Sequence, residues 1–345
     1  MTGSNGGTAI LDQFAERRTL TKIVAGFVIA AVLLYLLGVS AGWDRIFVAL
    51  RDAQPRWLAL ACLSTLLGLV AWGKAWQVVL AVIGIDVPFR RLVVTYFAAT
   101  FANYVTPFGQ AGGEPFIAYV LSQDTGASYE DSLASVVTAD LLNLLPFFNF
   151  AAIGLAVLVL RAQLPDAIRP LAFGLTALAV AIPALAYVGW NHRKGVEAGV
   201  LRVLAPIAHR TKRLSVEGAR ERIERFYASL EILAAEPREL LYALVFSYAG
   251  WVLFAIPLYL AARTLGTEID PLLVLFIVPA STIAGLMPTP GGTGGVEAVL
   301  VGLLDPLLGI PYATATAIAL VYRLASYWFG IVVGGIGALY VIARA

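Results

Sequence analysis

Long apolar runs separated by short polar stretches dominate the sequence. Six of these runs reach the ~20 residues that a helix needs to cross a ~30 Å hydrocarbon core. The predicted spans are 22–39, 57–84, 131–160, 168–190, 240–265 and 313–343. Two further apolar segments, 89–105 and 271–288, end in Pro/Gly-rich breaks that a helix cannot continue through. The pattern therefore predicts an all-α polytopic membrane protein with eight apolar segments.

The composition excludes a soluble fold. Hydrophobic residues make up 60% of the 345 positions and charged residues only 13%, about half the share of a soluble domain. Residues 1–20 read as a flexible tail, and 21–343 as a single membrane domain. One cysteine, Cys62, and two histidines, His192 and His209, form no metal-ligand pattern, so we expect neither a metal nor a cofactor.

The distribution of Lys and Arg predicts how the segments cross the membrane. If both broken segments crossed fully, the basic residues outside the spans would divide nine to thirteen between the two faces. If each turned at its break and returned, they would divide sixteen to six, which the positive-inside rule favours. We therefore expect six full spans in the cell membrane, with two re-entrant hairpins entering from opposite faces. Both termini and the insert 191–239 would be cytoplasmic.

The insert 191–239 carries ten Lys or Arg and seven Glu residues. Within it, 215–235 has apolar residues at helical spacing, which predicts an amphipathic helix on the membrane surface or against the bundle. A solvated helix that joins two spans is the alternative. The mixed charge and the adjoining spans argue against nucleic-acid binding.

The two breaks share a motif. The first runs from Thr106 to Glu114 and the second from Thr289 to Glu297, and each contains Thr-Pro, a Gly pair and Glu. Thr, Pro and Glu recur 183 residues apart, and the same offset relates Asp140 to Arg323, each inside a later span. We therefore predict an inverted internal repeat in which each half has a broken hairpin followed by a charged span.

The breaks also supply the candidate binding site. Irregular backbone at membrane depth must be buried in protein or line a cavity, and a helix that restarts there directs free N–H groups at an anion. The candidate substrate-binding residues are Arg323, Asp140, Glu114, Glu297, Gly112, Gly113, Gly292, Gly294, Gly295 and Asn103, and the helix-breaking residues are Pro107 and Pro290. None is a candidate for catalysis.

Two other roles fit the charged candidates. Glu114 and Glu297 would each complement the N-terminus of their own helix. Asp140 and Arg323 would neutralise each other as a buried ion pair, which a charged substrate could also open.

These motifs resemble the flippase-like membrane domain of lysylphosphatidylglycerol synthases and their stand-alone relatives. The resemblance is carried by the run from Pro290 to Glu297, by Tyr322-Arg323 and by the first break, and it spans roughly residues 20–343. Where the family often has Glu-Arg ahead of an Asp, this chain has Thr-Ala ahead of Asp140. The resemblance implies a stand-alone member that lacks the soluble synthase domain.

The same resemblance implies a transporter, not an enzyme, that moves a charged or polyprenyl-linked lipid between leaflets. The expected partners are membrane lipids with an anionic or polyprenyl-phosphate head group, and a second copy of the chain or an enzyme of lipid or glycan synthesis. Two alternatives remain: an ion-coupled transporter of a small solute that uses Glu114, Glu297 or Asp140 as proton carriers, and an integral-membrane lipid-modifying enzyme.

Overall fold

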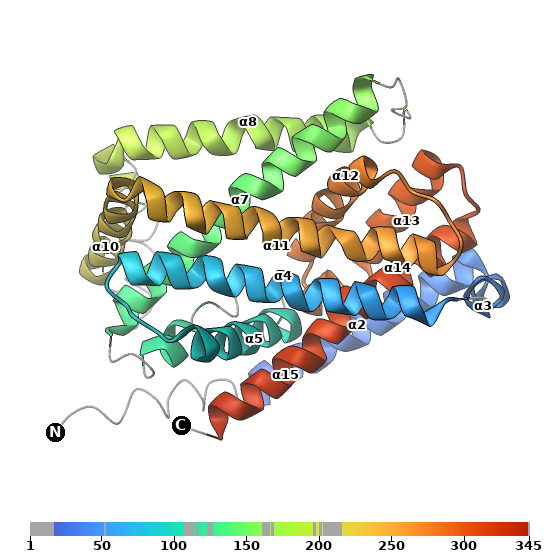
Figure 1. Cartoon of the computed structure of the whole chain (residues 1–345), viewed down its shortest axis with the longest axis horizontal. Coiled ribbons are helices and arrows are strands. Elements are labelled where there is room, and N and C mark those ends of the chain that lie inside the picture. Colours follow the sequence, from blue (N-terminus) through green and yellow to red (C-terminus); the bar gives the residue numbers. More distant parts are fainter. Residues whose placement is uncertain are drawn as a thin grey trace.

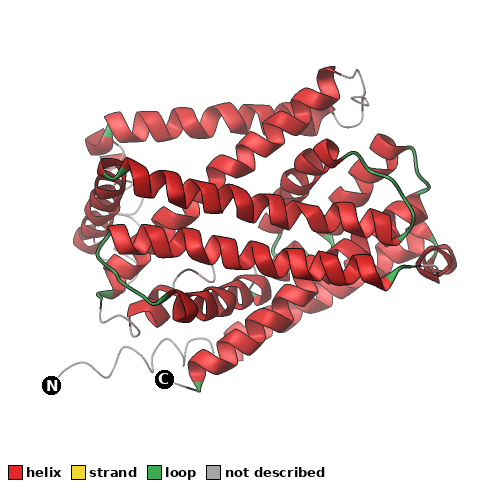
Figure 2. Ribbon diagram, in the orientation of Figure 1, coloured by secondary structure: helices red, strands yellow, loops and turns green. Residues whose placement is uncertain are grey.

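The computed structural model describes residues 17–51, 53–106, 114, 117–122, 127–160, 166, 169–195, 198–199, 202 and 216–343. All regular secondary structure in these ranges is helical (Figure 2). The longer helices are α2 (Arg17–Ala41), α3 (Trp43–Arg51), α4 (Pro55–Val82), α5 (Phe89–Val105), α7 (Tyr129–Leu160), α8 (Arg169–Asn191), α10 (Val216–Ala235), α11 (Pro237–Thr264), α12 (Pro271–Thr282), α13 (Gly295–Leu308), α14 (Tyr312–Arg323) and α15 (Phe329–Ile342).

Five of the six predicted membrane spans are confirmed by the length and composition of the helices. Six stretches of the described chain are long and apolar enough to cross a membrane, and five of them coincide with predicted spans. The sixth, Pro290–Leu308, contains the second break, and its continuous helix α13 has 14 residues, about 21 Å. Helix α8, the remaining predicted span, is not among these six stretches, but with 23 residues it is about 34 Å long, which is enough to cross a ~30 Å core.

The two halves of the chain repeat the same order of helices in opposite orientation. Helices α7 and α14 both begin at a tyrosine, Tyr129 and Tyr312, which lie 183 residues apart. Helices α4 and α11 lie side by side and antiparallel along the length of the bundle (Figure 1). The packing between halves is reciprocal, because α5 packs along α15 and α12 packs along α7. Such an exchange of contacts is what a twofold relation between inverted halves produces.

Different helices and turns lie at the two ends of the bundle. The start of α2, the end of α15 and helix α10 lie at one end, on the left in Figure 1. Helix α3 and the turn between α11 and α12 lie at the other end. Helix α5 enters from the left end, whereas α12 and α13 enter and return at the right end. The two breaks are therefore approached from opposite ends, as the charge distribution predicts.

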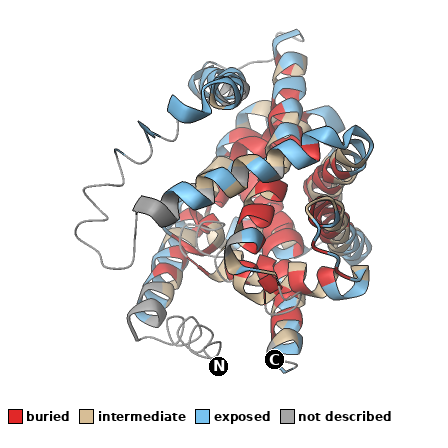
Figure 3. Cartoon of the chain, turned by 90° about the vertical axis from the view of Figure 1, so that its left-hand side faces the viewer, coloured by how far each residue is buried: buried red, intermediate tan, exposed pale blue. Residues whose placement is uncertain are grey.

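The predicted amphipathic helix is α10, and it packs against the bundle. It lies across the left end in Figure 1 and is seen along that face in Figure 3. Leu233 is buried in a cluster with Trp76 and Leu80 of α4, and Arg225 forms an ion pair with Asp131 of α7 at 3.2 Å. The rest of the predicted basic insert falls largely outside the described residues, as do residues 1–16 of the predicted tail.

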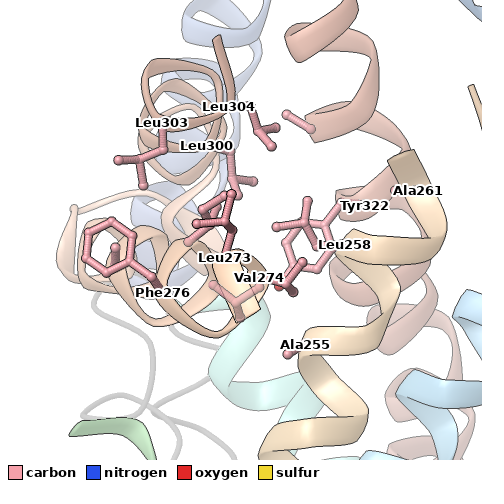
Figure 4. Close-up of a cluster of buried hydrophobic side chains, with 14 of the residues drawn as sticks. Ala255, Leu258, Ala261, Leu273, Val274, Phe276, Leu300, Leu303, Leu304 and Tyr322 are labelled. Carbon is pink, nitrogen blue, oxygen red and sulfur yellow. The ribbon is translucent and has the colours of Figure 1, made fainter. Parts of the chain in front are cut away.

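The main hydrophobic core fixes the second hairpin in place. Leucines of α13, including Leu300 and Leu304, pack with Leu273 of α12 and Leu258 of α11 (Figure 4). Tyr322, the residue before Arg323, belongs to the same cluster and comes from α14. This packing holds both arms of the second break against the span that carries Arg323.

Candidate functional site

The second break is a turn between two helices that are too short to cross a membrane. Helix α12 begins after Asp270, whose carboxylate accepts a hydrogen bond from the N–H of Leu272 at 2.8 Å. With 12 and 14 residues, α12 and α13 are about 18 and 21 Å long. Both start or end at the right end of the bundle (Figure 1), so residues 283–294 lie at membrane depth.

Three glycines of the second break, Gly291, Gly292 and Gly294, adopt backbone conformations that other residues resist. Gly291 has a φ of 55° and Gly294 a φ of 92°. A Cβ atom at Gly291 would lie 2.0 Å from the ring of Tyr327, and one at Gly294 would lie 2.5 Å from the side chain of Leu33. The turn can therefore pack against α2 and the last span only because these positions are glycine. The other second-break candidates, Pro290, Gly292 and Gly295, are buried in the same turn.

Arg323 and Glu297 form a buried ion pair. The Nε of Arg323 donates to Oε1 of Glu297 at 2.7 Å, and the two side chains are 9% and 1% exposed. The Nη2 of Arg323 donates to the carbonyl of Gly291 at 2.9 Å and to Oγ1 of Thr293 at 3.2 Å. Its guanidinium carbon lies 4.1 Å from the ring centroid of Tyr327, within cation–π range. Arg323 thus joins the last span to three residues of the second break.

The second carboxylate oxygen of Glu297 caps helix α13. Its Oε2 accepts a hydrogen bond from the N–H of Gly294 at 2.6 Å. The predicted alternative, in which Glu297 complements its own helix N-terminus, is therefore confirmed. Because the same carboxylate also neutralises Arg323, it already occupies the position in which the sequence predicts a substrate anion.

Asp140 does not pair with Arg323, so the predicted ion pair between them is wrong. Its Oδ1 accepts a hydrogen bond from Nε1 of Trp76 at 3.1 Å. It also interacts electrostatically with Glu114, an acid of like charge. The 183-residue offset relates equivalent positions in two inverted halves, and equivalence alone does not place the two side chains next to each other. Arg323 instead finds its acid, Glu297, within its own half.

Asp140 and Arg323 nevertheless lie at matching depths. Each follows the first residue of its helix, Tyr129 or Tyr312, by 11 positions, which is about 16 Å. Since α7 and α14 start at opposite ends of the bundle (Figure 1), both charges lie near the middle of a ~30 Å core. In the first half, the positions equivalent to Arg323 and Glu297 are both acids, Asp140 and Glu114.

The first break is described in part. Helix α5 ends at Val105, and the hydroxyl of Thr106 donates to the carbonyl of Ala102 at 2.7 Å. The Oδ1 of Asn103 is buried and has no hydrogen-bond partner among the residues that the structure describes. Glu114 is helical and half-buried. The remaining candidates of this break, Pro107, Gly112 and Gly113, lie outside the described residues.

The sequence analysis did not identify three side chains of the site. Tyr327 follows Arg323 by four positions, so helical spacing could have placed both on one face. Thr293 lies inside the second motif. No sequence signal links Trp76 to Asp140, because 64 positions separate them. Across the ranges that the structure describes, no group of three or more His, Cys, Asp or Glu side chains is arranged to hold a metal ion.

Comparison with known proteins places this arrangement in a family. The chain matches the family described as the lysylphosphatidylglycerol synthase TM region over residues 23–334. It is 29% identical to a UPF0104 membrane protein of Methanothermobacter thermautotrophicus over 343 residues, which cover 96% of each chain. A UPF0104 membrane protein of Pyrococcus horikoshii is 25% identical over 91% of this chain and 94% of its own length.

A longer relative also aligns. The protein named glycosyltransferase AglD, from Haloferax volcanii, is 25% identical over 95% of this chain but only 56% of its own length. The matched family region of residues 23–334 contains both breaks, Asp140 and Arg323. The chain therefore belongs to the lysylphosphatidylglycerol synthase TM region family.

Proposed function

We propose that the protein moves a lipid with a charged head group, either anionic or linked through a polyprenyl phosphate, between the two leaflets of the cell membrane. The observation that carries the proposal is the set of charged side chains at two helix breaks near mid-depth. Charge in this region is costly, and it is tolerated where it serves a substrate or ion pathway. A head group could cross at the breaks while its acyl chains remain in lipid.

Arg323 is the residue to which we assign the head-group phosphate. A guanidinium binds phosphate through two parallel N–H groups. Nε and Nη2 are engaged by the second break, whereas none of the described residues accepts a hydrogen bond from Nη1. An arriving phosphate would first bind Nη1 and would then compete with Glu297 for the rest of the guanidinium. In this proposal Glu297 holds the site in a neutral state between substrates.

The acid pair of the first break favours coupling to an ion. Asp140 and Glu114 interact electrostatically, and no Lys or Arg of the described chain lies within ion-pair distance of either. Two acids at membrane depth are stabilised when a proton or a cation binds between them. This observation also supports the second candidate function, an ion-coupled transporter of a small polar solute.

One of the relatives supports the proposal that the protein acts together with an enzyme. The relative named glycosyltransferase AglD extends well beyond the segment that matches this chain. We infer that the matched membrane segment works together with an enzyme of lipid or glycan synthesis. The transported lipid would be a product or an acceptor of that enzyme.

The experiment is reconstitution of the protein in liposomes that contain fluorescently labelled phosphatidylglycerol in both leaflets. Chemical quenching from outside measures how fast inner-leaflet lipid reaches the outer leaflet. Arg323→Lys keeps the charge and removes the planar fork, so we expect a flipping rate about tenfold lower, which is the factor for ~1.4 kcal/mol. The matched control is Arg263→Lys, since Arg263 contacts Tyr259 and Glu268 away from both breaks.

Two parallel measurements separate the alternatives. Uptake of a small solute without lipid movement would favour the ion-coupled solute transporter. A chemically altered lipid in the extract would show an enzyme. Normal flipping by a folded Arg323→Lys variant would remove Arg323 from the head-group site.

A further inference from the structure

Tyr327 contacts both the second break and the last turn of α5, which leads into the first break. Its hydroxyl lies 3.1 Å from the carbonyl of Pro290, in the second break. It also lies 3.1 Å from the carbonyl of Tyr104, the second-to-last residue of α5, two positions before the first break begins at Thr106. Tyr327 is 1% exposed. One buried hydroxyl therefore connects two segments that belong to different halves and enter from opposite ends of the bundle.

The local helix geometry brings Tyr327 to this position. Residues Leu324–Trp328 form a π-helical turn between α14 and α15, a distortion that often occurs at functional sites. The ring of Tyr327 lies under the guanidinium of Arg323 and 5.1 Å from the ring of Tyr104. Gly291 leaves space for the same ring, as its Cβ would lie 2.0 Å away. The second break and the last turn of α5 therefore contact the ring as well as the hydroxyl.

The hydroxyl has one proton for two acceptors. Both partners are backbone carbonyls, which accept hydrogen bonds but cannot donate them, so a stronger bond to one weakens the bond to the other. The equal distances of 3.1 Å mean that neither acceptor is favoured in this state. When the hydroxyl donates to Pro290, the carbonyl of Tyr104 is left without that proton, and the reverse is also true.

We propose that Tyr327 is a positioning residue that couples the two breaks by moving its single hydrogen bond from one to the other. A head group that binds Arg323 disturbs Gly291 and Thr293, which Arg323 holds, and so shifts the carbonyl of Pro290 relative to Tyr327. The hydroxyl then bonds to Tyr104, which changes the end of α5 and the first break. This inference rests on the proposed function for its trigger, but the coupling itself is a property of the fold.

The first test separates binding from transport. Tyr327→Phe keeps the ring and removes the hydroxyl, and Tyr259→Phe is the control because its hydroxyl accepts from Arg263 and contacts neither break. Binding of short-chain labelled phosphatidylglycerol in detergent should stay within about twofold for Tyr327→Phe, whereas the flipping rate falls about tenfold, as expected for one lost hydrogen bond. An unchanged flipping rate, or an equal fall in lipid binding and in the flipping rate, would overturn the coupling role.

The second test does not depend on lipid transport. Thr293→Ala removes the hydroxyl that donates to the carbonyl of Pro290 and accepts from Arg323, and so disturbs the second break and its bond to Arg323 without altering a residue of α5. When Thr293→Ala is the only substitution, hydrogen exchange of the backbone amides at 102–106 should become faster. When Thr293→Ala is added to the Tyr327→Phe variant, the exchange rate at 102–106 should stay unchanged. Equal acceleration in both backgrounds would refute the coupling. If the protein moved no lipid but the coupling depended on Tyr327, the proposed function would fail while this inference held.

Discussion

The carboxylate of Glu297 lies 2.7 Å from Nε of Arg323 and 2.6 Å from the backbone N–H of Gly294. A single acid thus neutralises the buried cation of the last span and caps the helix that follows the second break. Removing either charge leaves the other buried without a partner, which is far more costly than removing both.

We therefore expect Arg323→Gln and Glu297→Gln each to lower the free energy of unfolding by about 3–5 kcal/mol, and the double variant to regain part of that loss. Thermal unfolding in detergent measures all three. The exposed ion pair Arg225–Asp131 is the control, and its loss should cost less than about 1 kcal/mol. Additive losses at Arg323 and Glu297 would contradict a direct pair.

Asp140→Asn should not destabilise the protein, in contrast to Arg323→Gln and Glu297→Gln. Asparagine can still accept the hydrogen bond from Trp76, and the substitution removes a charge that interacts unfavourably with Glu114. Stability should therefore stay constant or rise, while flipping driven by an imposed proton gradient should fall. Asp131→Asn, at the exposed start of α7, controls for the change in net charge. A stability loss as large as that of Arg323→Gln would mean that Asp140 has a cationic partner.

The topology can be tested by thiol labelling in a Cys62→Ser background. Ser128 directly precedes α7 and Glu268 lies in the turn between α11 and α12, and both are exposed. The start of α7 and that turn lie at opposite ends of the bundle (Figure 1). A membrane-impermeant maleimide should label Glu268→Cys in intact cells and Ser128→Cys only in inverted vesicles, because the basic end is expected in the cytoplasm. Labelling of both positions from one side would rule out the six-span arrangement.

The glycine at 291 should tolerate no side chain. Gly291→Ala combines a positive φ, which costs about 1–3 kcal/mol as backbone strain, with a Cβ 2.0 Å from the Tyr327 ring. Gly302→Ala is the matched control, since Gly302 lies inside α13 with nothing within 4 Å of its Cβ position, and there alanine should stabilise by about 0.5–1 kcal/mol. Thermal unfolding of the two variants should therefore shift in opposite directions, and a tolerated Gly291→Ala would show that the turn can repack.

The sequence by itself determined the class of fold and the position of both breaks. Apolar length sets the number of spans because the hydrocarbon core has a fixed thickness. Proline and glycine end a helix by local chemistry, so the turn between α12 and α13 could be predicted from Pro290 and the following glycines alone. The 183-residue offset likewise predicted that α7 and α14 are equivalent, because a repeat is a property of the sequence.

Only the tertiary structure decided which charges meet. Arg323 pairs with Glu297, and Asp140 lies against Trp76 and near Glu114, because inverted halves place equivalent residues at equal depth without placing them in contact. The bonds of Tyr327 to Tyr104 and Pro290 join positions 223 and 37 residues away from it. Such partners are chosen by how the helices pack, and a hydropathy pattern contains no information about the direction in which a side chain points across the bundle.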